Sequence, residues 1–174
     1  KENDDERDFI SIVDFETKSF DESWQNSFDL NNISDSLSYA GKFSYNINQN
    51  MEWGPTFTNN IANLINHKNN FIDISVKVKG NINNESLLVA SLENNDDNIY
   101  WNGKPFSAFV TKNNENDWVT IYNSLKISDI QLNSYNIKLK IYIWNKGKNN
   151  YFIDDIRITL RNGNPILYGL IEPI

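Results

Sequence analysis

The sequence predicts an all-β domain, an antiparallel sandwich or barrel, on three observations. Apolar and polar residues alternate with a period of two in several segments, segments rich in Asn, Asp and Gly separate them, and helical periodicity is almost absent. Many short strands divided by turns are typical of antiparallel sandwiches and barrels. The 174 residues form one domain large enough to bury its own core, and no internal repeat divides them.

Two segments carry the strongest strand signal. Residues 72–79 and 137–144 alternate strictly, and each ends at a turn that contains glycine. The same reasoning predicts further strands at 11–16, 42–47, 87–92, 105–111, 118–125 and 151–160. Only residues 61–65 suggest one or two helical turns, with Asn59 or Asn60 as the N-cap.

Composition excludes several classes of function. The chain has 16 basic and 23 acidic residues and a net charge of −7, whereas nucleic-acid binding needs a concentrated basic face. It has no Cys and one His, which excludes disulfides, thiolate metal sites, cysteine nucleophiles and multi-histidine metal sites. No apolar run is long enough to span a membrane.

The chain also lacks the patterns expected of a hydrolase. A common arrangement of glycosidase carboxylates on a sandwich strand, Glu-x-Asp-x-x-Glu, is absent, and the neighbours Asp154 and Asp155 would point to opposite faces of a regular strand. His67 stands in a polar turn, and no Gly-x-Ser-x-Gly elbow accompanies it. We therefore expect no enzymatic activity from this domain itself, although a catalytic domain elsewhere in the protein is compatible with the sequence.

Five short motifs follow one another between residues 9 and 160: Val13-Asp14-Phe15-Glu16 followed by Trp24; Ser38-Tyr39-Ala40-Gly41-Lys42-Phe43-Ser44; Trp53-Gly54-Pro55 followed by Ile65 and the strand 72–79; Asp117-Trp118-Val119-Thr120-Ile121-Tyr122; and Tyr151-Phe152-Ile153-Asp154-Asp155-Ile156. In this order they resemble galactose-binding-like carbohydrate-binding modules, specifically those that bind cellulose and xylan. The resemblance implies a jelly roll of two packed sheets over 9–160. It leaves an acidic leader or linker at 1–8, expected to be disordered, and an extension at 161–174, expected to pack on the sandwich or on a partner.

The resemblance also implies a structural Ca²⁺ ion. Its carboxylate ligands would be Glu16 and Asp154, with backbone carbonyls near Lys18 and Gly41-Lys42 completing a shell of the hard oxygen ligands that Ca²⁺ prefers. The alternative is that Asp154 and its neighbour Asp155 accept hydrogen bonds from turn and backbone donors at a strand edge.

Alternation along 137–144 separates a core side from an outward side. If the four aliphatic residues at 137, 139, 141 and 143 face the core, Tyr142 and Trp144 face outward together with Lys138 and Lys140. Sugars present flat C–H faces that stack on such rings. Tyr142 and Trp144 are therefore candidates for a glycan platform.

Three further aromatic residues are candidates for glycan contact. The resemblance places Trp53 where xylan-binding relatives have a ligand-facing aromatic, and Tyr100 and Trp101 lie in a segment, 94–103, expected to form a loop at the rim. The alternative for all five is packing between elements, which is the usual role of aromatics in β-sandwiches. We expect Phe15, Trp24 and Trp118 in the core.

Polar side chains also project outward from the strand at 72–79, among them Lys77 and Lys79. If this strand shares a sheet face with 137–144, four lysines and two aromatics would gather there and suit an acidic polysaccharide. The alternative is that the lysines keep the strands soluble and protect their edges.

Two functions therefore remain. The first is a non-catalytic module of an extracellular bacterial protein that binds polysaccharide by aromatic stacking. The second is a structural or protein-interaction domain of a cell-surface protein, which the apolar extension at 161–174 favours because that extension could contact a neighbouring domain.

Overall fold

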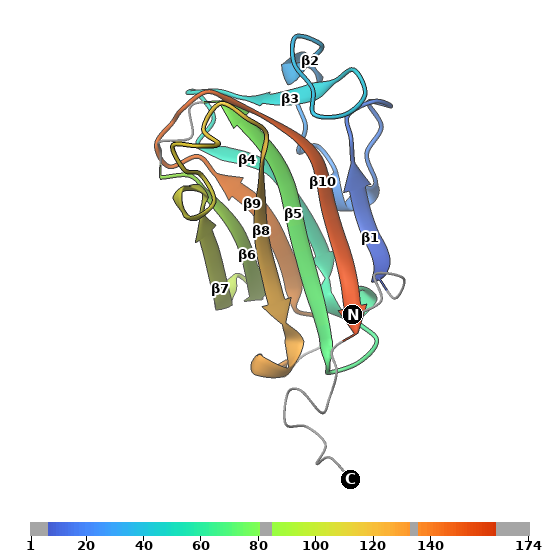
Figure 1. The fold of residues 1–174 in the computed structure, drawn as a ribbon. Coiled ribbons are helices and arrows are strands. Elements are labelled where there is room, and N and C mark those ends of the chain that lie inside the picture. Colours follow the sequence, from blue (N-terminus) through green and yellow to red (C-terminus); the bar gives the residue numbers. More distant parts are fainter. Residues whose placement is uncertain (1–6, 81–84, 133–135, 163–174) are drawn as a thin grey trace.

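Two antiparallel sheets stacked face to face make up the fold (Figure 1). The structure is a computed structural model that describes residues 7–80, 85–132 and 136–162. Its strands are β1 (Arg7–Val13), β2 (Ile33–Ser34), β3 (Ser44–Ile47), β4 (Trp53–Asn60), β5 (Asn70–Gly80), β6 (Leu87–Asn94), β7 (Asp97–Pro105), β8 (Val119–Lys126), β9 (Lys138–Trp144) and β10 (Tyr151–Asn162). Short 3-10 turns are η2 (Glu22–Trp24), η3 (Leu30–Asn32), η4 (Ile61–Asn63), η5 (Phe106–Ala108) and η6 (Ile127–Asp129).

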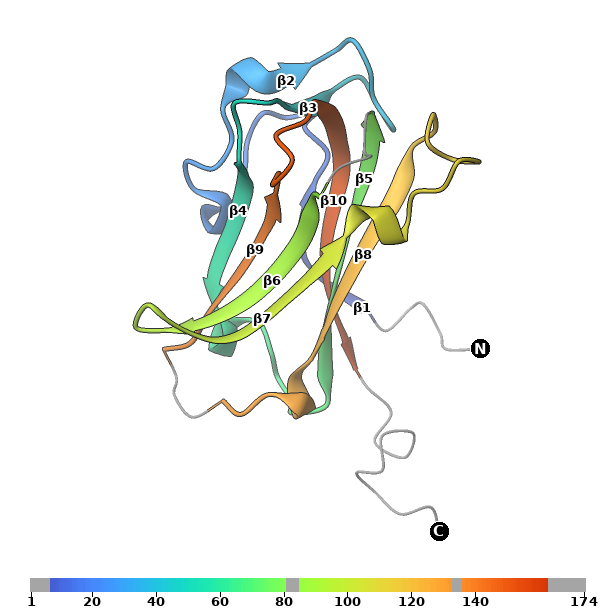
Figure 2. The same cartoon turned by 90° about the vertical axis from the view of Figure 1, so that its left-hand side faces the viewer.

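The larger sheet is built around β10. Its order is β2-β3-β10-β5-β8, and β1 also pairs with β10, beside the part of that strand that β3 leaves free. The smaller sheet has the order β4-β9-β6-β7 and faces the viewer in Figure 2. This arrangement confirms the predicted antiparallel sandwich of two packed sheets.

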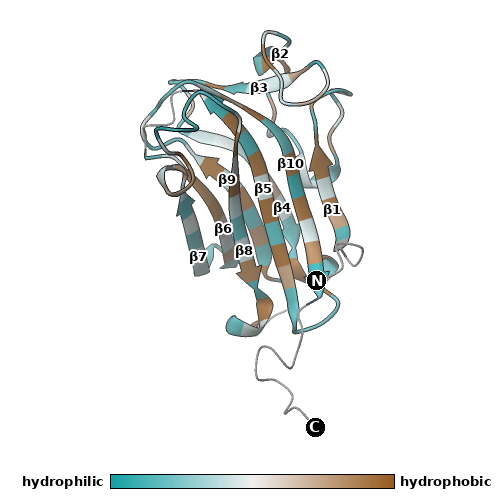
Figure 3. Cartoon of the chain, viewed as in Figure 1, coloured by the Kyte–Doolittle hydropathy of each residue, from teal (hydrophilic) through white to brown (hydrophobic). Residues whose placement is uncertain are grey.

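Side-chain alternation places the core between the two sheets. Brown and teal residues alternate along the strands in Figure 3, as expected when one face of each strand is buried. The four aliphatic residues predicted to face inward from β9 are buried, as are Phe15 and Trp24. Trp118 is an exception: it is only half-buried and meets Tyr39 edge to face, with ring centroids 6.0 Å apart, so its assignment to the core is wrong.

The structure corrects the secondary structure expected for residues 94–111. The expected loop at 94–103 is largely strand β7, joined to β6 by Asn95 and Asp96, whose φ angles of 47° and 71° suit a two-residue hairpin turn. The expected strand at 105–111 instead contains the 3-10 turn η5. Alternation is weak along β7 because most of its side chains are exposed on a sheet edge.

The two strongly alternating segments lie in different sheets. Residues 72–79 belong to β5 in the larger sheet, whereas 137–144 correspond to β9 in the smaller sheet. The lysines of β5 and the aromatics of β9 therefore point away from each other on opposite outer faces. The condition for gathering four lysines and two aromatics on one face is therefore not met, because a period of two sets the buried side of a strand but not its sheet.

The expected terminal segments fall mostly outside the described residues. The leader at 1–8 overlaps the first two residues of β1, and the extension at 161–174 overlaps the last two of β10; residues 1–6 and 163–174 are not described. Within the part of the chain that the structure describes, no helix has the length and apolar character needed to cross a bilayer.

Truncating the inward face of β9 should destabilise the fold far more than truncating its outward face. Leu139 is fully buried, so Leu139→Ala should lower the free energy of unfolding by about 2–5 kcal/mol. Lys138 is exposed, and Lys138→Ala should change the free energy of unfolding by no more than about 0.5 kcal/mol. Urea unfolding of the two variants beside the wild type measures both values, and equal effects would contradict the assigned faces of β9.

Candidate functional site

The outward face of the smaller sheet gathers aromatic side chains through strand register. Trp53 on β4 lies directly opposite Trp144 on β9, and Thr56 lies opposite Tyr142. Directly opposed residues of an antiparallel pair project to the same side of the sheet. We call the cluster of Trp53, Tyr142, Trp144 and Trp101 the aromatic face.

The two tryptophans at one end of the aromatic face form a stack. The ring centroids of Trp53 and Trp144 are 5.2 Å apart and their planes differ by 14°. Tyr142 meets Trp53 edge to face at 5.8 Å, with the ring planes 68° apart. Trp53 is the more exposed ring of the stack, with 55% of its surface accessible, while Trp144 beside it is half-buried. None of the three rings is buried in the core.

Trp101 reaches the aromatic face from β7. It lies opposite Ser91 of β6, which in turn lies opposite Lys140 of β9. Its indole lies over Gly103, where a Cβ atom would collide with the ring. The Trp101 indole N–H donates to the Tyr142 hydroxyl at 3.4 Å and so links the two strands across β6.

Tyr100 does not belong to the aromatic face. It lies opposite Leu92, a fully buried residue of the inward side, and packs partly buried against the core. Trp101 and Tyr100 are neighbours on a strand and therefore point to opposite sides. The expected loop at the rim is wrong because the segment is a strand, and the glycan contact predicted for Tyr100 would have to lie apart from the aromatic face.

Charged side chains border the aromatic face. The Lys140 ammonium pairs with the Glu93 carboxylate at 2.8 Å, across the β6–β9 ladder. The Lys146 ammonium lies 5.6 Å from the centroid of the Trp144 ring. Polar groups thus lie beside apolar ring surfaces, the combination that small-molecule and sugar sites use for orientation and contact.

Asn145 holds the backbone on both sides of the tryptophan stack, a role that sequence reasoning missed by assigning it to a turn. Its side chain is fully buried, and its backbone N–H donates to the Glu52 carbonyl at 2.7 Å. The side-chain nitrogen donates to the carbonyls of Asn48 (3.2 Å), Met51 (2.9 Å) and Asn149 (3.0 Å). This amide therefore ties the segment before Trp53 to the segment after Trp144.

The two expected calcium ligands bind one loop. Glu16 Oε1 accepts hydrogen bonds from the backbone N–H groups of Lys42 (2.9 Å) and Phe43 (2.8 Å). Asp154 is fully buried, and its Oδ2 accepts from the N–H groups of Tyr39 (2.9 Å) and Ala40 (3.3 Å). Burial raises the pKa of Asp154, and these backbone hydrogen bonds partly oppose the shift. Both carboxylates thus contact residues 39–43.

The oxygen atoms near this loop are of the kind that bind a calcium ion. A carboxylate oxygen that accepts a hydrogen bond keeps further lone-pair sites, so Glu16 and Asp154 can still ligate a cation. Gly41 has a φ of 68°, and a Cβ there would lie 2.5 Å from Glu16 Oε1, so glycine at this position lets the loop approach the carboxylate closely. The described residues contain no group of three or more acidic, His or Cys side chains around one point, so backbone carbonyls would have to supply most ligands.

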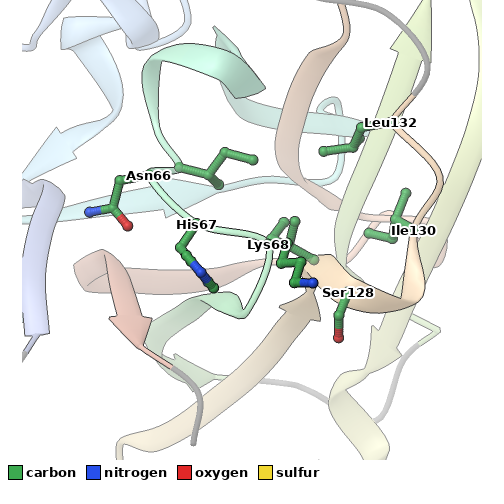
Figure 4. A pocket seen from close by; sticks show the side chains of 8 residues that line it. Asn66, His67, Lys68, Ser128, Ile130 and Leu132 are labelled. Atoms are coloured by element: carbon green, nitrogen blue, oxygen red, sulfur yellow. The ribbon is translucent and has the colours of Figure 1, made fainter. Parts of the chain in front are cut away.

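A separate surface pocket lies at the opposite end of β4 from Trp53. It has a volume of about 500 Å³ and contains His67, Lys68 and Ser128 beside Ile130 and Leu132 (Figure 4). His67 is exposed, and its Nδ1 accepts from the backbone N–H of Asn69 at 3.1 Å. This arrangement agrees with the loop position expected for His67 and includes no acidic partner that would activate it.

Comparisons with known proteins identify the fold. No family model matches the sequence, and no curated protein matches it. A solved structure described as a xylan-binding domain of CBM 22 superposes with a TM-score of 0.52 at 18% identity, over 90% of this chain and 96% of that one. The CBM22-1 xylan-binding domain of Paenibacillus barcinonensis Xyn10C gives 0.48 at 19% identity, over 76% and 81% of the two chains. CBM27-1 of Caldicellulosiruptor saccharolyticus, solved with mannohexaose, gives 0.40 at 17% identity, over 84% and 94%.

The resemblance to jelly-roll carbohydrate-binding modules, stated above on five sequence motifs, is thereby confirmed at the level of the fold. Only the first of these three similarities is close enough to carry an argument about architecture, and it covers most of both chains. Similarity of fold does not transfer a ligand, because unrelated functions share the same architecture.

Adding a methyl group at Gly103 should displace the Trp101 indole with little loss of stability. In Gly103→Ala the new Cβ occupies the position of the ring, whose flexible side chain can move into solvent. We expect the indole N–H signal of Trp101 to shift in NMR spectra and the free energy of unfolding to change by less than about 1 kcal/mol. Gly147→Ala, at an exposed turn, is the control. An unmoved Trp101 signal in Gly103→Ala would contradict this placement of the ring.

Proposed function

We propose that this domain is a non-catalytic glycan-binding module that holds a polysaccharide on the aromatic face. The observation that supports the proposal is the register of the smaller sheet, which gathers Trp53, Tyr142, Trp144 and Trp101 on one outward surface. Isolated exposed aromatics are ordinary, but a cluster drawn from three strands is a feature of binding surfaces.

The chemistry of sugars fits this surface. The C–H faces of pyranose rings are flat and apolar, and they pack on indole and phenol rings while hydroxyls bond to polar groups at the edge. Asn145 holds the backbone next to Trp53 and Trp144 in the free protein. The entropy lost when this backbone becomes ordered on ligand binding is therefore smaller. The Lys140–Glu93 pair offers both a donor and an acceptor to sugar hydroxyls.

We also propose a class of ligand and a location for the protein. A polysaccharide backbone of the kind named for the fold neighbours, such as xylan or mannan, would suit a row of stacking rings. Such polymers are met outside the cell, so we propose an extracellular or bacterial-surface location. A non-catalytic role is consistent with the ion pair between Glu93 and Lys140. Glycosidases need two available carboxylates, and the Glu93 carboxylate is paired with a lysine.

A second candidate function is protein interaction through the larger sheet. Phe9 and Ile12 are exposed on β1, with 58% and 49% of their surfaces accessible. Among the described strands, β1 pairs only with β10, and exposed apolar side chains on an edge strand can contact another protein. The apolar extension that first suggested this function lies outside the described residues, apart from Arg161 and Asn162.

Removing one ring of the stack should weaken glycan binding. Trp144→Ala deletes the inner indole and lowers the contact area, so we expect affinity for soluble xylan or mannan to fall at least about tenfold. Affinity gel electrophoresis and titration calorimetry measure the loss.

Tyr122→Ala is the matched control for this loss. It removes a ring that is 57% exposed but belongs to β8 of the other sheet, so affinity should be unchanged. Equal effects in the two variants would move the site away from the aromatic face. No binding by the wild type to any polysaccharide of a broad panel would favour the protein-interaction function.

We also propose that Glu16 and Asp154 bind a structural calcium ion. An ion that binds only the folded state raises stability, by about 2.7 kcal/mol at a concentration 100 times its Kd. The midpoint of thermal unfolding should therefore rise by several degrees from EDTA to millimolar CaCl₂. Glu16→Gln should abolish the rise and Glu115→Gln, on an exposed loop, should retain it. An identical midpoint in EDTA and CaCl₂ would rule the ion out.

A further inference from the structure

One polar atom within the aromatic face has no partner. The indole nitrogen of Trp144 is inaccessible to solvent, and no hydrogen-bond acceptor reaches it among the residues that the structure describes. Buried donors in folded proteins are almost always paired, because an unpaired one has lost its hydrogen bond to water and gained nothing in return. An unpaired donor inside a surface cluster therefore calls for an explanation.

Two other indole donors have acceptors in the fold. Trp24 Nε1 donates to Ser11 Oγ at 2.8 Å, and Trp101 Nε1 donates to the Tyr142 hydroxyl at 3.4 Å. The fold thus supplies acceptors to a buried and to an exposed tryptophan. Among the buried side-chain nitrogens of the described residues, only the Trp144 indole nitrogen has no hydrogen-bond acceptor.

The group stacked on Trp144 is a side chain that can move. Trp53 lies almost parallel to it at 5.2 Å and has more than half of its own surface in solvent. The β4–β9 ladder is irregular between Trp53 and Thr56, at the end of β4 where the Trp53 side chain projects. Asn145 anchors the backbone on both sides of the stack, through bonds to the carbonyls of Met51 and Glu52 before Trp53. Rotation of the Trp53 indole about its side-chain bonds would uncover the stacked face of Trp144 while the backbone that Asn145 holds stays in place.

We propose that the Trp144 indole N–H donates a hydrogen bond to an oxygen of the bound glycan, and that Trp53 is a cover that moves aside to admit it. This inference rests on the proposed function. It makes Trp144 a residue that determines specificity: while one sugar packs on the indole face, the ligand must also place an oxygen at the edge of the indole, near the plane of the ring, where the N–H points. Lys146, whose ammonium lies near the same ring, can reach other hydroxyls of that sugar.

The test compares the ring with and without its N–H. Trp144→Phe keeps an aromatic surface but lacks the donor, so its affinity for xylohexaose or mannohexaose should fall about tenfold, the effect of one well-formed hydrogen bond. Trp118→Phe, which lies outside the aromatic face, should bind like the wild type. Calorimetry gives both affinities, and circular dichroism confirms that the variants are folded.

A second measurement uses the wild-type chain and does not depend on the folding of a variant. Each of the five tryptophans gives one indole N–H signal in a nitrogen-15 spectrum. At saturation with the hexaose, the Trp144 proton should shift downfield while that of Trp24, already bonded, stays in place. In ligand-free Trp53→Ala, the Trp144 N–H should exchange with water faster than in the wild type.

The outcomes separate this inference from the proposed function. If a hexaose binds and Trp144→Phe binds it equally well, or the Trp144 signal does not move, the donor role is wrong while glycan binding stands. If the exchange rate of the Trp144 N–H is the same in Trp53→Ala, Trp53 is not the cover. If neither hexaose nor either polymer binds to the wild type, the proposed function fails and this inference fails with it.

Discussion

The antiparallel register of β9 with its two neighbours is the constraint on which the candidate site depends. β9 pairs with β4 on one side and β6 on the other, and both ladders place opposed residues on a common face. A shift of one residue in either ladder would send Trp144 into the core and an isoleucine into solvent. The burial of Ile141 and Ile143 therefore fixes the outward direction of Tyr142 and Trp144 as firmly as it fixes the core.

Buried polar side chains extend this order into the loops. Asn145 links the segments on both sides of the tryptophan stack, and Glu16 and Asp154 hold the loop at 39–43 from two different parts of the chain. In each case one side chain satisfies several backbone groups that a turn would otherwise leave unpaired. The abundance of Asn in the sequence is in part explained by such roles, because its amide both donates and accepts.

Sequence patterns predicted the strands with long alternation of apolar and polar residues and missed strands in which it is short or absent. Residues 72–79 and 137–144 alternate strictly, and both are strands with the expected inward faces. β4 and β7 were not expected: β4 alternates only from Pro55 to Thr58, which is too short for a clear signal, and most of β7 is exposed. Because 94–103 was expected to be a loop, which has no alternation, nothing separated Tyr100 from Trp101.

The sequence by itself determined the all-β class, the inward face of its strongest strands and the outward position of Tyr142 and Trp144, because alternation is a local property of the chain. Only the tertiary structure decided that Trp53 stacks on Trp144, that Trp101 joins them and that the β5 lysines lie on the opposite outer face. These depend on which strands become neighbours. Pairing between distant segments is set by the packing of the whole core and leaves no signature in any single segment.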